Sequence, residues 1–546
     1  GSAFARAIGY LLAKLPGYAA DEVLAVATLF IRPGQIIEAR KVRKKQRFIS
    51  ARVIAAYIPP RWSQIRLGSE RVVEAIREKI FTESTVSTSS ILDSNEDEDL
   101  LTPVNTNNWL SVFKRPEVLG FLALAAITII NSRKRFGALV GGALPISPAG
   151  ATDLWSTYFE SWHQVGLGSA SATPPWVAVI AIASLAVLGK VQFLITIFFL
   201  TAPLLIMWSG FNLLKRLTSN SWISVPAAFL YAISPVAFAA INTGHIATLV
   251  ILIVAPFVAL LLHDWWSIEN YSWRKIFAIS LLFSLLYAFT LMSFLIALVA
   301  SIVVALDNFE QYSLHKDKDL FKQQLLKRTA LVFVPFFANA PYSLEAVLHP
   351  SRFLSEPGLL IPGGGPLAVL LGNPGGSGSL PLWLVSPILL VLAVSLFSST
   401  HARHIAEYGI GFLILAVLFG ALSISSHGNE SSTKVWAGPV LAIATLAAVS
   451  AGAVMLDRLR ETLVLSHIHY RHILSALLLI ITFTYAVLTI GYSVSAGANS
   501  LVQANRSTVM PAFLSVEPDT KILVLREVGS ADDKKIQYYI SRGDDI

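Results

Sequence analysis

The stretch from Val191 to Leu214 reads VQFLITIFFLTAPLLIMWSGFNLL, and the first charges after it are Lys215 and Arg216. A helix needs about 20 apolar residues to cross the hydrocarbon core of a bilayer, and this run is long enough. Similar runs recur along the 546 residues, of which 54% are hydrophobic and only 14% charged. The sequence therefore predicts an all-α polytopic membrane bundle rather than a soluble domain.

About eleven spans are expected in this bundle. The run from Ile276 to Leu306 is divided near Thr290 and Ser293, because one long span would place the lysines that follow on the opposite side from the other basic loops. Val177 to Leu188 is short for a span and is expected to lie along the outer surface. Besides that divided pair, the spans cover Glu117 to Phe136, Val191 to Leu214, Val225 to Ala240, His245 to Leu262, Ala330 to Leu344, Leu382 to Phe397, Ile405 to Leu422, Val435 to Leu456 and Ile473 to Val494.

The positive charges of the chain mark the side of the membrane on which its loops lie. The net charge is +8, and Lys and Arg gather in short segments between apolar runs. This pattern is typical of cytoplasmic loops and does not indicate nucleic-acid binding. It predicts a cytoplasmic N-terminus and an extracytoplasmic C-terminus. Arg133, Lys134 and Arg135 depart from the rule, because they follow the first span on the expected outer side.

Four regions are expected along the chain. Residues 1–83 contain the basic block EARKVRKKQRF and predict an amphipathic helical region on the cytoplasmic surface. Residues 84–115 contain SNEDED and predict a disordered acidic linker. Residues 116–495 form the membrane domain, with outer loops at 137–175 and 345–380. Residues 496–546 form an extracytoplasmic tail, in which KILVLREV and KIQYYISRG predict a β-hairpin. We expect this tail to be truncated, and the whole chain to be a fragment.

The first outer loop carries the strongest candidates for chemistry. Asp153 and Glu160 lie seven residues apart and would share one face of a helix. Either carboxylate can act as a general base toward a sugar hydroxyl, or hold a divalent cation (Mg, Mn or Ca) against a phosphate leaving group. Trp155, Tyr158 and Trp162 would then stack on sugar rings. The alternative is an aromatic belt at the membrane interface with solvated acids.

Further polar residues of the outer loops are candidates for binding a phosphate. His163 and His245 are candidate phosphate contacts, although a histidine such as His245 more often caps a helix. His349 and Arg352, with Glu356, are candidates to clamp an anionic lipid carrier, and the alternative is that they are surface residues. The chain has no cysteine, which excludes disulfides and thiolate metal sites, and the metal ligands are not defined by the sequence.

Several stretches of the chain resemble a known family. The run from Arg6 to Arg61, especially LLAKLPGYAADEVLAVATLFIRPGQIIEARKVRKKQ, is similar to the segment that follows the catalytic domain of large bacterial family 2 glycosyltransferases with a membrane-embedded C-terminal half. DLWSTYFESWHQVGLGSASATPPW, LGNPGGSGSLPLW and KILVLREVGSADDKKIQYYISRGD resemble later landmarks of that architecture. The resemblance implies synthesis of an envelope glycan or glycolipid at the bacterial plasma membrane, and an upstream nucleotide-sugar glycosyltransferase domain.

A looser similarity links the chain to C-type glycosyltransferases, including envelope arabinofuranosyltransferases. These enzymes use a polyprenyl-phosphate sugar donor and an acidic residue in the first outer loop, the position that Asp153 occupies here, although the familiar pair of acids is missing. The similarity implies transfer of a hexosyl or pentosyl group from a polyprenyl-phosphate-linked sugar to an envelope glycan acceptor. The alternative is a non-catalytic membrane anchor or export partner for the upstream domain, motivated by the basic N-terminus.

Overall fold

The chain divides into two units, Gly1–Phe113 and Lys114–Ile546, and every residue described below belongs to the second. The predictions for residues 1–83 and for the linker up to residue 114 therefore lie outside the described part of the chain. The computed structural model describes residues 115–145, 147–148, 150–163, 169–262, 268, 270–315, 318–358, 360–376, 378–384, 386–398, 400–425, 432–464, 470–496, 500–504, 521–528 and 535–542.

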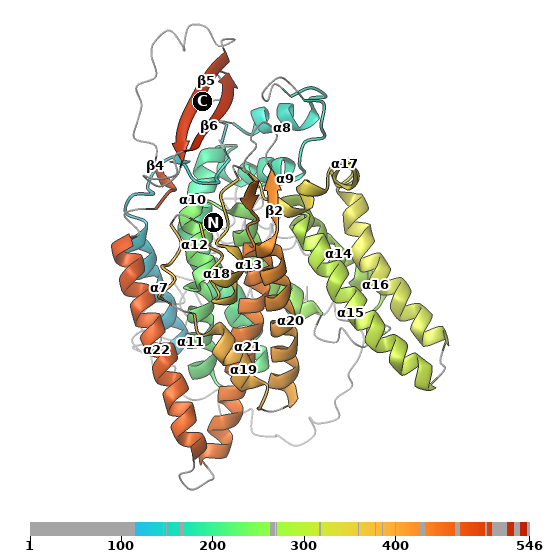
Figure 1. The fold of residues 1–546 in the computed structure, drawn as a ribbon, viewed down its shortest axis with the longest axis vertical. Helices are drawn as coiled ribbons and strands as arrows, with labels where there is room; N and C mark the ends of the chain where they lie inside the picture. The colour runs from blue at the N-terminus through green and yellow to red at the C-terminus, as the bar shows by residue number, and fades with distance from the viewer. Residues whose placement is uncertain are drawn as a thin grey trace, which may run out of the picture. The chain divides into compact units, whose positions relative to one another are not determined.

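Helices of very different length make up most of the described part (Figure 1). Among the described residues, four helical stretches are long and apolar enough to cross a membrane, one of which (Ser221–Thr243) comprises α11 and α12; they are five if the bent pair α16 and α17 counts as one span. In chain order the helices are α7 (Pro116–Asn131), α8 (Ala151–Phe159), α9 (Trp176–Ser184), η1 (Leu185–Val187), α10 (Val191–Leu217), α11 (Ser221–Ala232), α12 (Pro235–Thr243), α13 (Ile246–Leu261), α14 (Trp273–Phe289), α15 (Met292–His315), α16 (Lys318–Ala338), α17 (Tyr342–Leu348), η3 (Pro350–Leu354), α18 (Gly365–Leu370), α19 (Ile388–Ser395), α20 (Thr400–Ala421), α21 (Gly438–Val464) and α22 (Tyr470–Ala496).

Local sequence explains where these helices begin and end. Ser234 caps α12 by accepting a hydrogen bond from the backbone N–H of Ala237, and Pro235 occupies the first helical position. Gly244 closes the same helix in the left-handed conformation, with φ of +86°. Thr290 is extended and separates α14 from α15, which confirms the break predicted near this residue.

The prediction of eleven spans is not confirmed. The four candidate spans agree with predicted ones: α10, the continuous pair α11 and α12 (Ser221–Thr243), α20 and α21. The bounds of α9 with η1 agree with those of the predicted short helix. The expected span from Leu382 to Phe397 was wrong, because it holds only the eight-residue α19, about 12 Å long, against a hydrocarbon core of roughly 30 Å. The expected start at Ala330 was also wrong, since α16 begins at Lys318 and is bent by 98° where α17 follows.

Three two-stranded antiparallel sheets complete the described fold. β5 (Lys521–Val528) pairs with β6 (Lys535–Arg542), which confirms the hairpin predicted for the tail. β2 (Ser423–Ser425) pairs with β3 (Ser432–Lys434) between α20 and α21. β1 (Leu139–Val140) pairs with β4 (Gln503–Ala504), which joins the segment after α7 to the segment after α22.

One end of the bundle is built from irregular segments that bond to one another, and we call it the loop end. It comprises residues 135–145, 242–248, 355–364, 432–436 and 500–504, and lies toward the upper end of the bundle in Figure 1. The backbone N–H groups of Ala143 and Val502 donate to the carbonyls of Thr243 and Asn242, and that of Gly363 donates to Lys434. These bonds satisfy backbone groups that no helix or sheet supplies with partners. The loop end is therefore one interlocked structure made from distant parts of the chain.

Candidate functional site

α8 holds the two acids that the sequence predicts as catalytic. Its first residue is fixed to the bundle, because the N–H of Ala151 donates to the carbonyl of Gly189 (3.0 Å) and Leu154 is buried in the core. Asp153 lies in the first turn and Glu160 is the residue that ends the helix, and both are exposed. They are therefore at opposite ends of α8, roughly 10 Å apart along its axis at about 1.5 Å per residue.

Asp153 has a structural role within its own helix. Its Oδ2 accepts a hydrogen bond from the backbone N–H of Gly150 (3.2 Å), and its Oδ1 accepts one from the hydroxyl of Thr152 (3.3 Å). An acid in the first turn also interacts favourably with the positive end of the helix dipole. The carboxylate nevertheless remains exposed, so a solvent-borne or lipid-borne ligand can reach it.

The aromatic residues of this segment fall into two groups. Trp155 and Tyr158 are partly buried against the core of the bundle. Trp155 also stacks on Phe159, with ring centroids 5.6 Å apart and planes 15° apart. Trp162 is 56% exposed and lies beyond the helix. Trp155, Tyr158 and Phe159 therefore form an aromatic cluster on α8, and Trp162 lies outside it.

His163 closes the segment that follows α8. Its backbone N–H and carbonyl pair with those of Ser169, and its Nε2 lies 2.9 Å from the hydroxyl of Thr173. The same hydroxyl is 3.1 Å from the carbonyl of Thr157, to which it donates. Because the single hydroxyl hydrogen serves that carbonyl, the Nε2–H of His163 donates to Thr173. The side chain of His163 thus fastens the loop to the last turn of α8.

Glu345 of α17 holds the segment between α8 and α9. Both of its carboxylate oxygens lie 3.0 Å from the backbone nitrogen of Ala172, which donates to them, and Oε2 accepts from Nη1 of Arg352 (2.8 Å). The guanidinium also lies over the ring of Tyr342. Arg352 is therefore paired within the protein, and His349 beside it is exposed.

Replacing Glu345 by Gln is expected to release the first outer loop. The charge-assisted bonds to Ala172 and Arg352 would become weaker neutral ones, which costs about 1.5 kcal/mol or roughly tenfold in local opening. Hydrogen exchange of the peptide containing Ala172 should quicken by that factor. Glu160→Gln is the matched control, and equal exchange in the two variants would contradict the tie.

A second cluster of polar side chains lies inside the loop end. Oε2 of Glu356 is 3.1 Å from Nδ1 of His245, and its Oε1 accepts a hydrogen bond from the hydroxyl of Thr248 (2.6 Å). The side chains of His245 and Glu356 are only 3% and 4% exposed. Thr248 in turn accepts from the indole N–H of Trp436 (3.0 Å), so its hydroxyl hydrogen is committed to Glu356.

The ring of His245 is fixed on its face as well as at its edge. It stacks on Trp436, with centroids 3.7 Å apart and planes 10° apart. Its Nε2 is buried and has no hydrogen-bond partner among the described residues. Gly438 leaves room for this arrangement, because a Cβ there would lie 2.1 Å from Nε1 of Trp436. We call Glu356, His245, Thr248 and Trp436 the buried network.

The structure brings together some of the predicted residues and separates others. His245 and Glu356 form a pair, whereas Arg352 pairs with Glu345, which the sequence did not single out. Thr248 and Trp436 were missed as well, because they are 188 residues apart and neither stands in a recognisable motif. Within the described residues, no group of three or more His, Asp or Glu side chains is arranged to hold a metal ion.

The apolar helices define the class of this chain as a helical membrane protein. No protein-family model matches it, and no curated protein matches it. Among solved structures it is similar to the arabinofuranosyltransferase AftD from Mycobacteria, determined by single-particle cryo-electron microscopy. The two are 12% identical with a TM-score of 0.46, and the match covers 72% of this chain and 28% of AftD. The chain thus corresponds to little more than a quarter of the length of that protein.

Proposed function

We propose that this chain is a membrane glycosyltransferase module of cell-envelope glycan or glycolipid synthesis. It would take a sugar from a polyprenyl-phosphate donor at the outer leaflet and transfer it to an envelope glycan. One observation carries the proposal: α8 presents an exposed carboxylate, Asp153, beside the aromatic cluster of Trp155, Tyr158 and Phe159, at one end of an apolar helical bundle. Aromatic faces beside a carboxylate suit a sugar hydroxyl that must lose a proton.

In this proposal Asp153 is the general base, and it takes the proton of the acceptor hydroxyl as the bond to the donor sugar forms. The lipid phosphate leaves with the electrons of the bond that breaks. Glu160 is a second acid or metal ligand, and Trp155 and Trp162 hold the sugar. His163 or His245 is the phosphate contact, and His349 with Arg352 contacts the carrier. Within the buried network, Glu356, Thr248 and Trp436 fix the ring of His245.

The experiment measures sugar transfer in membranes supplied with a polyprenyl-phosphate sugar. Asp153→Asn should lower transfer about 100-fold or more, because removing a general base costs 10²–10⁴ in rate. Glu407→Gln is the matched control, since Glu407 is an exposed acid on α20 that pairs with Arg403. Transfer that is unchanged by Asp153→Asn, at equal protein in the membrane, would overturn the catalytic assignment. Chelation followed by addition of Mg, Mn or Ca tests the proposed cation.

A second candidate function is a non-catalytic anchor or export partner for an upstream nucleotide-sugar glycosyltransferase domain. It is favoured by the hydrogen bonds of Asp153 to Gly150 and Thr152, which give this carboxylate a sufficient structural role. Fusing the upstream domain to an unrelated membrane anchor separates the two functions. Full restoration of glycan synthesis would support the anchor, and failure would support a reaction in the membrane module.

A further inference from the structure

Arg135 is a buried cation without a carboxylate partner among the described residues. It follows α7, is 2% exposed, and its Nη2 donates to the side-chain oxygens of Asn242 and Ser500 (2.8 Å to Ser500), which are both neutral. Its Nε is buried and has no partner in the described part of the chain. Burial lowers the pKa of Arg135 to about 10, so the guanidinium keeps its charge at neutral pH. A buried charge is costly unless an opposite charge accompanies it.

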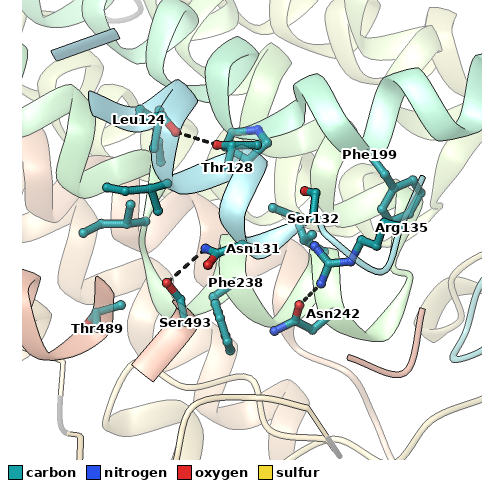
Figure 2. A pocket seen from close by; sticks show the side chains of 15 residues that line it. Leu124, Thr128, Asn131, Ser132, Arg135, Phe199, Phe238, Asn242, Thr489 and Ser493 are labelled. Carbon is teal, nitrogen blue, oxygen red and sulfur yellow. Dashed lines mark hydrogen bonds between the residues drawn. The ribbon is translucent and has the colours of Figure 1, made fainter. Parts of the chain in front are cut away.

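A small cavity of about 50 Å³ adjoins this guanidinium (Figure 2). The side chains of Thr128, Asn131 and Ser132 from the end of α7 line it, and Ser493 of α22 faces Asn131, with the two side chains 3.0 Å apart. Its volume admits roughly three or four water-sized groups, at about 10–15 Å³ each. A phosphate group fits this size, and a sugar ring does not.

A long apolar groove continues from this cavity along the same helices. It has a volume of about 1050 Å³ and is lined by α7, α11, α19, α21 and α22. On α7 its lining ends at Ala123, and the lining of the small cavity begins at Leu124. On α22 the groove lining ends at Ile490, beside Thr489 and Ser493 of the cavity. The two spaces therefore adjoin on both helices, and we call them together the seam.

The groove is open to the apolar surroundings of the bundle. Trp222 and Phe483, which lie on its two sides, are 64% and 67% exposed. α22 is joined to α7 near the cavity, where Asn131 donates to Ser493 and Arg133 donates to the carbonyl of Val494 (3.0 Å). Away from these bonds, the space between the helices is lined by apolar side chains. Such a groove suits hydrocarbon chains, because burying apolar surface is favourable there and a polar ligand would find few hydrogen-bond partners.

We propose that this seam binds one anionic phospholipid of the bilayer, with its phosphate beside Arg135 and its acyl chains in the groove. The position agrees, because Arg135 follows the apolar run of α7, and the residues after an apolar membrane helix lie near the headgroups. The phosphate supplies the counter-charge that the neutral partners Asn242 and Ser500 lack. The occupant is a structural lipid whose binding is independent of the proposed transfer reaction, since the cavity has no room for a sugar.

Native mass spectrometry of the full chain in detergent tests the site with added phosphatidylglycerol and phosphatidylcholine. Phosphatidylglycerol is expected to bind more tightly, and Arg135→Gln should weaken it about tenfold, the effect of losing one charge-assisted hydrogen-bonded contact. Arg216→Gln is the matched control, because Arg216 is an exposed cation in the last turn of α10 that lines neither the cavity nor the groove. Equal binding of the two lipids, or equal effects of the two variants, would overturn the proposal.

A variant in the groove tests the proposal even if Arg135→Gln impairs folding. Ala486 lines the groove on α22, and Ala486→Phe should weaken long-chain phosphatidylglycerol while leaving a short-chain analogue unchanged. Equal loss for both chain lengths would contradict a chain site in the groove. Polyprenyl monophosphate is added as a competitor in a separate arm. If it displaces phosphatidylglycerol at lower concentration, the seam belongs to the lipid carrier, and the assignment to a bilayer phospholipid is overturned.

Discussion

Replacing Glu356 by Ala is expected to destabilise the bundle by roughly 2–6 kcal/mol, because it removes the acceptor of two buried donors, at about 1–3 kcal/mol for each. The variant leaves Nδ1 of His245 and the hydroxyl of Thr248 without acceptors inside the loop end. It also frees the segment after η3, which Glu356 attaches to the first turn of α13. The thermal midpoint of the detergent-solubilised protein should fall by several degrees. The midpoint is measured by size-exclusion chromatography of samples heated to increasing temperatures.

Glu407→Ala is the control for this prediction. Glu407 pairs with Arg403 and His404 on the exposed side of α20, where its side chain is 42% exposed. Such pairs contribute no more than about 0.5 kcal/mol, because water screens them. A second comparison uses His245→Ala: the double variant with Glu356→Ala should be less destabilised than the sum of the singles. Equal shifts for Glu356→Ala and Glu407→Ala would show that the buried network does not stabilise the bundle.

Gly358→Ala is expected to cost about 3 kcal/mol or more, through backbone strain and overlap together. Gly358 has a φ of +98°, and a Cβ on it would lie 1.6 Å from the carbonyl oxygen of Ala143. Neither backbone can give way without separating two segments of the loop end. The expected result is a lower thermal midpoint and faster hydrogen exchange of the Ala143 amide, which donates to Thr243.

Substitutions at two other glycines distinguish backbone strain from steric overlap. Gly365 also has a positive φ, +72°, but a Cβ there meets nothing within 4 Å, so Gly365→Ala should cost only the strain, about 1 kcal/mol. Gly411 lies inside α20 with open space around it, so Gly411→Ala should stabilise by up to about 1 kcal/mol. If Gly358→Ala and Gly365→Ala shift the midpoint equally, the close approach to Ala143 contributes nothing.

Hydropathy predicted those helices whose ends coincide with a change in polarity. α10 begins at Val191, where its apolar run begins, and Thr290 interrupts the pair that follows α13. Hydropathy did not predict the ends of helices that continue through polar residues or stop within an apolar run. α16 extends back to Lys318 through charged residues that a hydropathy window excludes, and Pro387 delays the start of α19 inside an apolar stretch.

The candidate site was predictable only where its residues are neighbours in sequence. The acids and aromatic residues of α8 share one segment, so helical spacing places them together. His245 and Glu356 are 111 residues apart, and Glu345 and Ala172 are 173 apart, so no local pattern encodes their pairing. The basic residues after α7 show the same limit. Arg135 departs from the rule that Lys and Arg gather in cytoplasmic loops. The reason is that its side chain is buried in the protein, whereas the rule applies to charges exposed on loops.

The interlocked loop end has a consequence for biosynthesis. Arg135 near the start of the membrane unit donates to Ser500, and the N–H of Val502 donates to Asn242, so the partners of early residues are made only after α22. Until residues 500–502 are made, Arg135 has only Asn242 as an acceptor, and the carbonyl of Asn242 lacks its donor from Val502. We therefore expect chains shortened before residue 500 to insert all their helices and yet remain protease-sensitive, since the loop end is completed only when residues 500–504 are present.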